Sequence, residues 1–131
     1  MHQMGKTEFF SELNRLMTEF GRTKVIIGGD WNLTIDPVLD RTGPPIHSNK
    51  TDRAYLKDIV EDHGLVEPWR LFHPEEEEYT HISATHNTSS RIDFFLVSHS
   101  LLSRVCSTEI IPEGITDHIP VRLTLYIGLP S

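Results

Sequence analysis

The segment Gly28-Gly29-Asp30-Trp31-Asn32 places a carboxylate and a carboxamide two residues apart, directly after an apolar run. In extended backbone Asp30 and Asn32 lie on the same side of the chain, where they could hold a metal-bound phosphate and a water molecule together. The two glycines would let the backbone turn and let a ligand approach closely. The same residues also favour an ordinary turn, so this segment alone does not predict chemistry.

A second acidic group lies in Arg91-Ile92-Asp93-Phe94, which has the residue types of a strand. Alternation predicts Arg91 and Asp93 on one face of that strand, with Ile92 and Phe94 in the core on the other. A surface ion pair would also place Arg91 and Asp93 on one face of the strand. The functional interpretation is a carboxylate that orients an imidazole, as in nucleophile-activating triads.

The imidazole could come from Thr116-Asp117-His118, in a polar loop before the last apolar alternation. Asp117 can bind a hard cation, and His118 can exchange a proton near neutral pH. An Asp-His pair is common in loops, so the prediction depends on the three segments together. Each borders an expected strand, and each supplies a different part of one reaction on a phosphate ester.

Hydrophobic periodicity predicts the elements that must position these side chains. Residues 7–20 have apolar side chains at helical spacing, and residues 24–27 form a β-branched run typical of a buried strand. A second helix is expected at 52–62, with Thr51 as its N-cap and Gly64 as its C-terminal stop. The other expected elements are a long loop at 33–51, a hairpin of strands 79–83 and 91–97, a helical turn at 100–104, and strands at 105–111 and 121–127.

Composition narrows the classes of function. The formal net charge of −7 argues against simple electrostatic binding to nucleic acid, but suits a site that holds a divalent cation. Cys106 is the only cysteine, which excludes an intrachain disulfide, and we expect a small buried thiol there. No run approaches the ~20 apolar residues of a membrane span, and the N-terminus has no signal-peptide core. We therefore expect an intracellular protein with no membrane partner.

Together and in this order, the three segments resemble the exonuclease–endonuclease–phosphatase (DNase-I-like) superfamily. In that family, Gly-Asp-x-Asn, Arg-Ile-Asp-aromatic and Ser-Asp-His motifs follow one another in the same order along the chain. The closer resemblance is to the endonuclease domain of LINE-type retrotransposons, and it includes residues 36–41, 79–83 and 90–98. The chain departs from the pattern at Thr116, where serine is usual, but the hydroxyl is kept.

The resemblance implies an α/β fold, the C-terminal half of a four-layer α/β sandwich with mixed, mostly antiparallel sheets flanked by helices. It implies one partial domain, residues 1–131, without an N-terminal half that would bring a metal-binding Glu, an Asn and a Tyr. We therefore expect weak or no nuclease activity from the chain alone.

The resemblance also implies roles for individual residues. The expected catalytic residues are Asp30, Asn32, Asp93 and His118; the expected metal ligands are Asp117, Asp30, Asn32 and His118; the expected substrate contacts are Asn32, Thr80, Arg91 and Thr116. The metal would be Mg²⁺ or Mn²⁺, and Asp93 would orient His118. Both His118 and Asp30 remain candidates for the general base.

The implied function is metal-dependent phosphodiester hydrolysis, as in a retrotransposon-type DNA endonuclease that nicks its substrate in the nucleus. The expected partners are DNA and the missing half-domain or reverse-transcriptase region of a parent protein. One alternative is another phosphodiesterase or phosphatase of the superfamily, including one that acts on lipid head groups. Another is a non-catalytic, degenerate retroelement fragment that at most binds a partner.

Overall fold

The structure is a computed structural model that describes residues 5–20, 23–43, 49–112 and 117–128. In chain order the elements are α1 (Lys6–Phe20), β1 (Ile26–Asp30), α2 (Lys50–Asp62), β2 (Leu65–Val66), α3 (Pro68–Phe72), β3 (His81–Ser83), β4 (Thr88–Ser90), β5 (Asp93–Ser98), the 3₁₀ helix η1 (His99–Arg104), β6 (Val105–Ile110) and β7 (Val121–Leu125). Among the described helices, none has the length and apolar character needed to cross a membrane.

A three-stranded antiparallel sheet of β1, β5 and β2 lies at the centre, with β5 in the middle. The register of β1 against β5 pairs Ile26 with Val97 at one end and Asp30 with Asp93 at the other. Two further antiparallel pairs, β3–β4 and β6–β7, complete the described strands. The β1–β5 register therefore brings the first two acidic segments together at one end of a ladder.

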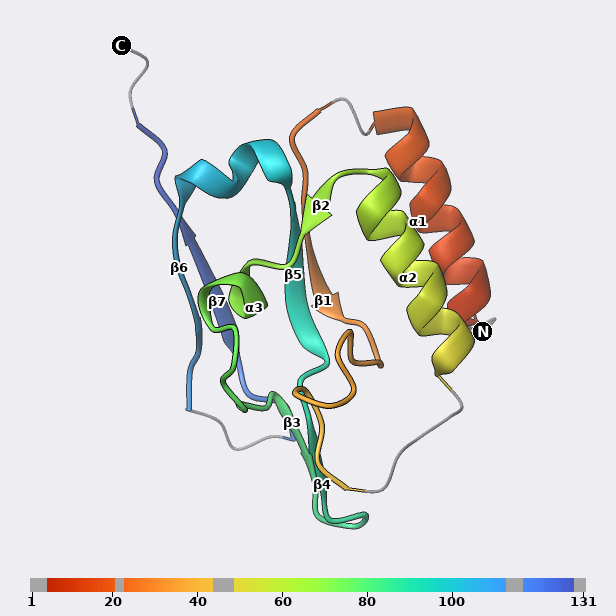
Figure 1. Cartoon of the computed structure of the whole chain (residues 1–131), viewed down its shortest axis with the longest axis vertical. Helices are drawn as coiled ribbons and strands as arrows, with labels where there is room; N and C mark the ends of the chain where they lie inside the picture. Colours follow the sequence, from red (N-terminus) through yellow and green to blue (C-terminus); the bar gives the residue numbers. More distant parts are fainter. Residues whose placement is uncertain (1–4, 21–22, 44–48, 113–116, 129–131) are drawn as a thin grey trace.

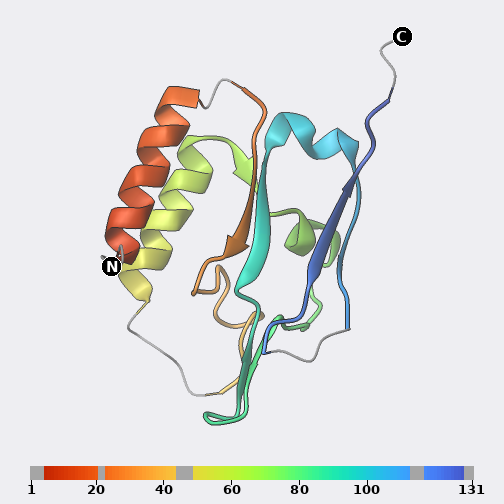
Figure 2. The same ribbon diagram turned by 180° about the vertical axis from the view of Figure 1, so that it is seen from behind.

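The two faces of the central sheet are covered differently. Helices α1 and α2 cover one face of the sheet, as Figure 1 shows. Ile27, Phe94 and Leu96 belong to the core on that face. The opposite face is turned toward the β6–β7 pair, which Figure 2 shows from behind. Asp30 and Asp93 alternate onto this second face, so the helices leave their carboxylates uncovered.

The core between the sheet and the helices follows the predicted helical spacing. Phe10, Leu13 and Met17 of α1 and Leu56 and Ile59 of α2 are buried and recur every three or four residues. Trp31 joins this core directly after β1. Its ring stacks on Phe94 at 5.3 Å between centroids, and its indole Nε1–H donates to the Phe94 carbonyl oxygen at 2.9 Å. Trp31 thereby anchors the turn that carries Asp30.

The ends of α2 bear out one predicted boundary and correct the other. Gly64 follows the C-cap residue with a left-handed φ of 61°, which favours glycine as the C-terminal stop. Thr51 is not the N-cap. The helix begins at Lys50, two residues before the predicted start, and Asn49 occupies the N-cap position without a side-chain capping bond.

Other expectations about the strands are also corrected. The run expected as a buried strand forms β1, which starts at Ile26 and lies at a sheet edge, with Ile26 48% exposed. The hairpin partner of β3 is β4 rather than residues 91–97, because the chain leaves one sheet at Ser90 and enters the next at Asp93. Cys106 is exposed on β6, so its thiol is not buried.

The Phe95 ring approaches the backbone closely at Gly28 and so favours glycine there, whereas nothing comes close at Gly29. A Cβ at Gly28 would lie 2.5 Å from Cε1 of Phe95, its partner across the ladder, while a Cβ at Gly29 would meet nothing within 4 Å. We expect Gly28→Ala to lower the free energy of unfolding by about 1–3 kcal/mol through overpacking. Gly29→Ala is the matched control and should be neutral. Urea unfolding of both variants measures the difference, and equal midpoints would show that Phe95 moves aside freely.

Candidate functional site

Asp30, Asp93 and His118 meet at the end of the β1–β5 ladder. Nδ1 of His118 lies 2.8 Å from Oδ2 of Asp93, with the ring N–H as donor, and Nε2 lies 3.7 Å from Oδ2 of Asp30. Two carboxylates directly opposite each other destabilise a ladder. His118 lies against both of them. The three residues that the sequence placed in separate motifs therefore form one cluster, and the predicted orientation of His118 by Asp93 agrees with the geometry.

Backbone bonds between the β3 segment and the loop before β7 hold His118 in this position. The Ile119 N–H donates to the Thr80 carbonyl at 2.6 Å, and the Ile82 N–H donates to the Asp117 carbonyl at 3.2 Å. His81 and His118 form an isolated antiparallel bridge between these bonds. Hydrogen bonds on both sides of His118 therefore hold its loop to the β3 segment.

Thr80 fixes Asp93 through its hydroxyl. Its Oγ1 accepts from the backbone N–H groups of both Ile92 and Asp93, at 3.1 Å each. The residue is fully buried. This burial corrects the expectation that Thr80 contacts substrate, because its side chain is directed at the backbone beneath the site rather than at solvent.

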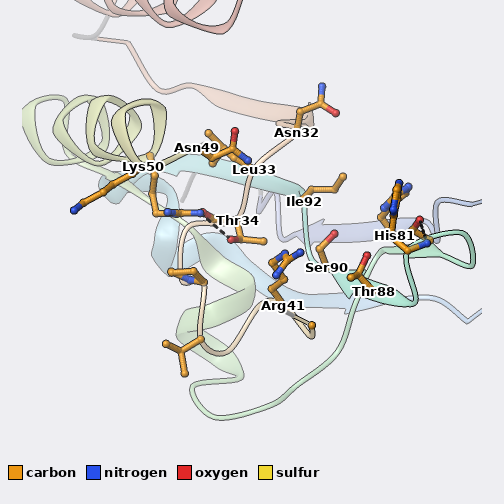
Figure 3. A pocket seen from close by; sticks show the side chains of 16 residues that line it. Asn32, Leu33, Thr34, Arg41, Asn49, Lys50, His81, Thr88, Ser90 and Ile92 are labelled. Atoms are coloured by element: carbon orange, nitrogen blue, oxygen red, sulfur yellow. Dashed lines mark hydrogen bonds between the residues drawn. The ribbon is translucent and has the colours of Figure 1, made fainter. Parts of the chain in front are cut away.

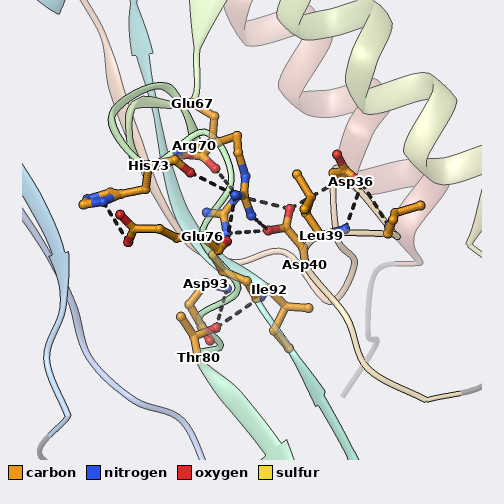
Figure 4. A network of polar contacts seen from close by, with 12 residues as sticks. Asp36, Leu39, Asp40, Glu67, Arg70, His73, Glu76, Thr80, Ile92 and Asp93 are labelled. Atoms are coloured by element: carbon orange, nitrogen blue, oxygen red, sulfur yellow. Dashed lines mark hydrogen bonds and ion pairs between the residues drawn. The ribbon is translucent and has the colours of Figure 1, made fainter.

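Arg91 is likewise buried and belongs to an ionic network, part of which Figure 4 shows. Its Nε donates to Oδ1 of Asp40 at 2.9 Å and its Nη2 to Oδ2 at 3.2 Å, a bidentate pair. Arg91 also pairs with Glu67, and Arg70 pairs with the same Asp40. The guanidinium lies 4.6 Å from the centre of the Trp69 ring. Arg91 is therefore not a substrate contact, and it does not share a strand face with Asp93.

This network explains how the long loop after β1 is held. Besides the ion pair, the Arg91 N–H donates to the Asp40 carbonyl at 2.8 Å. Burial raises the pKa of Glu67, and the charge of Arg91 opposes that rise. Because Arg91 lies two residues before Asp93, the same side chain ties the loop to the start of β5.

Asn32 holds the turn after β1 in an uncommon conformation. Its φ is 55°, a left-handed value that asparagine tolerates better than most residues. Its backbone N–H donates to Oδ1 of Asp30 at 2.9 Å, which orients that carboxylate. Nζ of Lys6 donates to the Asn32 carbonyl and to Oδ1 of Asn49, both at 2.8 Å. Lys6 went unnoticed in the sequence, because only the fold brings α1 to this turn.

The remaining predicted residues differ in how they are placed. Asp117 is exposed next to His118. Thr116 lies outside the described residues. The hydrogen bond to Asp93 raises the pKa of His118 above its ordinary value, and the charges of Asp93, Asp30 and Asp117 act in the same direction against partial burial. The site is therefore electronegative and favours a bound cation, whether a proton or a metal.

The raised pKa of His118 predicts a pH dependence of stability. The folded chain binds this proton more tightly than the unfolded chain, so the stabilisation is complete below the unfolded pKa of about 6.5 and is lost as the pH rises through the folded pKa. As the pH rises from below 6.5 through the folded pKa of His118, we expect the urea midpoint of the unaltered chain to fall relative to that of His118→Gln. Asp93→Asn, which removes the largest cause of the shift, should reduce that difference. Parallel pH profiles for all three proteins would contradict the prediction.

The donor atoms at this site suit a divalent cation. One oxygen from each of Asp30 and Asp93 and one nitrogen of His118 lie within 4.8 Å of one another, whereas the exposed Asp117 precedes His118 in the chain and is not part of this group. Hard cations such as Mg²⁺ take one or two carboxylates and keep several positions for water or phosphate oxygens. The cluster lines a groove of about 360 Å³ that also includes Gly29, which leaves space for such a group.

A second, larger cavity has a volume of about 590 Å³ (Figure 3). Its lining includes Asn32 at one side, His81 at another, and three basic side chains, Arg41, Lys50 and Arg53. In a chain of net charge −7, these cations favour an anionic ligand at this place.

Comparison with solved structures identifies proteins that share this fold. The 3′-5′ exonuclease NExo from Neisseria meningitidis matches with a TM-score of 0.71 and 23% identity, over 92% of this chain and 51% of that one. The catalytic domain of Xenopus laevis APE2 matches with a TM-score of 0.74 and 24% identity, over 89% and 41%. These likenesses confirm the predicted α/β fold, with antiparallel sheets and flanking helices.

The chain belongs to the endonuclease–reverse transcriptase family, whose model matches residues 2–122. It is also 30% identical to the transposon TX1 uncharacterized 149 kDa protein of Xenopus laevis, over 96% of this chain. The alignment covers only 10% of that protein, so the chain spans about a tenth of this relative and half or less of the solved structures. The predicted resemblance to retrotransposon endonucleases is confirmed.

Proposed function

We propose that this chain carries the histidine-containing part of a metal-dependent site that nicks DNA by hydrolysing a phosphodiester. The observation that supports this most directly is the contact of His118 with Asp93 at Nδ1, while Nε2 is turned toward Asp30 and the groove. A carboxylate on one ring nitrogen fixes the tautomer and leaves the other nitrogen for the reacting phosphate or water.

The electrostatics of the site favour one division of labour between His118 and Asp30. The raised pKa of His118 increases its protonated fraction at neutral pH, and an imidazolium donates to a phosphate oxygen rather than accepting a proton. Asp30, oriented by the Asn32 N–H, is then the group that positions or deprotonates the attacking water. Asn32 would support this water or the phosphate from the turn.

Asp30 and Asp117 are the carboxylates that would hold Mg²⁺ or Mn²⁺, with His118 and Asn32 nearby. Such an ion, when bound, stabilises the charge that develops on the phosphate and the leaving oxygen. The chain itself aligns His118 and Asp30, and it holds the carboxylates close enough together for an ion to offset their negative charge.

We further propose that these residues form the C-terminal part of a DNase-I-like domain in a larger nuclear polypeptide that includes a reverse-transcriptase region. Support comes from the share of each match, a tenth of the TX1 protein and half or less of the solved domains. The NExo structure solved with a product DNA hairpin, at 19% identity, makes DNA a reasonable substrate to test. On this proposal the chain alone is a weak nuclease, because another segment supplies part of the metal site.

Nicking of supercoiled plasmid tests the proposal. We expect slow nicking that needs Mg²⁺ or Mn²⁺ and stops in EDTA, and faster nicking when a polypeptide with the N-terminal part of a family domain is joined to the chain. In the joined protein, Asp30→Ala and His118→Ala should each lower the rate by about 10²–10⁴-fold. The matched controls, the exposed residues Asp58 and His99 changed to alanine, should leave it unchanged.

Two results would contradict different parts of this proposal. Robust nicking by the chain alone, lost in Asp30→Ala and His118→Ala, would show that the site needs no further segment. Absence of metal-dependent cleavage in the joined protein would favour a non-catalytic fragment. In that case calorimetry should also detect no Mg²⁺ binding that depends on Asp117.

A phosphatase is the second candidate, because the solved NExo structure with DNA is described as that of a 3′ phosphatase. The same groove would then take a terminal phosphate monoester. Release of inorganic phosphate from a 3′-phosphorylated oligonucleotide, measured beside plasmid nicking and lipid head-group release, separates these activities.

A further inference from the structure

His81 lies directly against the face of the histidine at the reacting site. The His81 and His118 rings are 4.7 Å apart between centroids, at an interplanar angle of 47°. The two residues are opposed in an antiparallel bridge, which places their side chains on the same side as neighbours. The contact therefore comes from the backbone pairing of β3 with the loop before β7, and does not depend on a chance rotamer at the surface.

Asp93 and His81 contact the His118 ring from different directions. The hydrogen bond from Nδ1 to Asp93 holds one edge of the imidazole, and the His81 ring lies against its plane. Asp30, at 3.7 Å from Nε2, is too far for a normal hydrogen bond. The side chain of His118 is 42% exposed, so the chain encloses the ring only in part. A ring packed against the imidazole opposes rotation out of the plane that the Asp93 contact requires.

We propose that His81 is a positioning residue for His118, holding the imidazole in the plane in which Nδ1 meets Asp93 and Nε2 faces Asp30. This inference extends the proposed function, because it concerns the same histidine. His81 also lines the cavity of about 590 Å³, on the far side from Lys50 in Figure 3. A ligand in this cavity could therefore contact the ring that packs against His118.

The test compares variants that keep or remove the flat ring. His81→Phe keeps an aromatic face, His81→Leu keeps bulk without a flat ring, and His81→Ala removes both. His86 also lines the cavity but lies in the turn between β3 and β4, so His86→Ala is the matched control. Backbone amide spectra of each variant establish that the chain is folded, and His81→Leu replaces His81→Ala if the alanine variant is not.

The first readout is the tautomer of His118, from the ¹⁵N shifts of its ring nitrogens at an alkaline pH where the ring is neutral. We expect one tautomer, protonated at Nδ1, in the unaltered chain, in His81→Phe and in His86→Ala. His81→Ala and His81→Leu should shift toward a mixture of both tautomers. Unchanged shifts in His81→Ala and His81→Leu, or a shift in His81→Phe as large as in His81→Ala, would overturn the proposal.

The second readout is the nicking rate of the joined protein described above. Displacement of a catalytic group by about 1 Å can cost about 10²-fold in rate, so we expect a loss of that order in His81→Ala and near-complete rescue in His81→Phe. The two readouts separate the two proposals. A tautomer change without nicking in any protein would refute only the proposed function, whereas nicking that is unaffected in His81→Ala would refute only the role of His81.

Discussion

Replacement of Arg91 by methionine is expected to lower the free energy of unfolding by about 3–5 kcal/mol, the usual cost of removing one partner from a buried ion pair. Asp40 is fully buried and the Glu67 side chain nearly so, and Arg91 pairs with both carboxylates. Methionine restores most of the volume against Trp69 but leaves these carboxylates short of a cation. Arg70 still pairs with Asp40, which limits the loss. Urea unfolding followed by tryptophan fluorescence measures the change.

The matched control for Arg91 is Arg122→Met. Arg122 pairs with Glu109 across β6 and β7, but both side chains are about half exposed. Exposed pairs contribute about 0–1 kcal/mol, so this variant should unfold almost as the unaltered chain does. Similar losses in the two variants would mean that burial of the Arg91 network is not what makes it important.

The second large effect is expected at Thr80. In Thr80→Val the shape is kept, but the Ile92 and Asp93 N–H groups lose the oxygen that accepts both. An unsatisfied buried donor costs about 1–3 kcal/mol, so we expect a loss of about 2–5 kcal/mol for the pair. Because Asp93 is one of these two residues, the variant should also loosen its contact with His118. Urea unfolding and the ring ¹⁵N shifts of His118 report the two effects separately.

Thr80→Ser keeps the hydroxyl and loses only a methyl group, which makes it the control for Thr80→Val. We expect it to cost little more than one buried methyl, about 1 kcal/mol, and to leave the His118 ring shifts unchanged. A larger loss in Thr80→Ser than in Thr80→Val would show that packing of the methyl group, and not the shared hydroxyl, makes Thr80 important.

The parts of the site that could be predicted from the sequence are those encoded locally. Gly-Asp-x-Asn, the Asp93 strand and the Asp117-His118 loop each sit at a strand boundary, and strand boundaries follow from short-range periodicity. The superfamily resemblance supplied the order in which they combine. The direct opposition of Asp30 and Asp93 was not predicted, because the register of the ladder is a property of the fold and not of either motif.

The rest depends on contacts between residues distant in the chain. Alternation placed Arg91 beside Asp93, but the strand breaks between Ser90 and Asp93, so Arg91 turns inward to Asp40. Threonine is common at exposed strand positions, and only the fold shows that the hydroxyl of Thr80 accepts hydrogen bonds from two backbone N–H groups. His81 shows no local signal at all, because its partner is far along the chain. Cysteine is usually buried, but Cys106 is exposed at the point where the pairing of β6 with β7 is irregular, between Val105 and Ser107.

The opposed carboxylates of Asp30 and Asp93 occupy the last register pair of their ladder. Terminal pairs of a ladder open most readily, and mutual repulsion adds to that tendency. On the proposed function, a divalent cation held beside these carboxylates would offset their repulsion. Its binding would then favour closure of β1 on β5, because a ligand that binds only the closed form stabilises that form by mass action. Binding of the ion and order at this end of the sheet would therefore be linked.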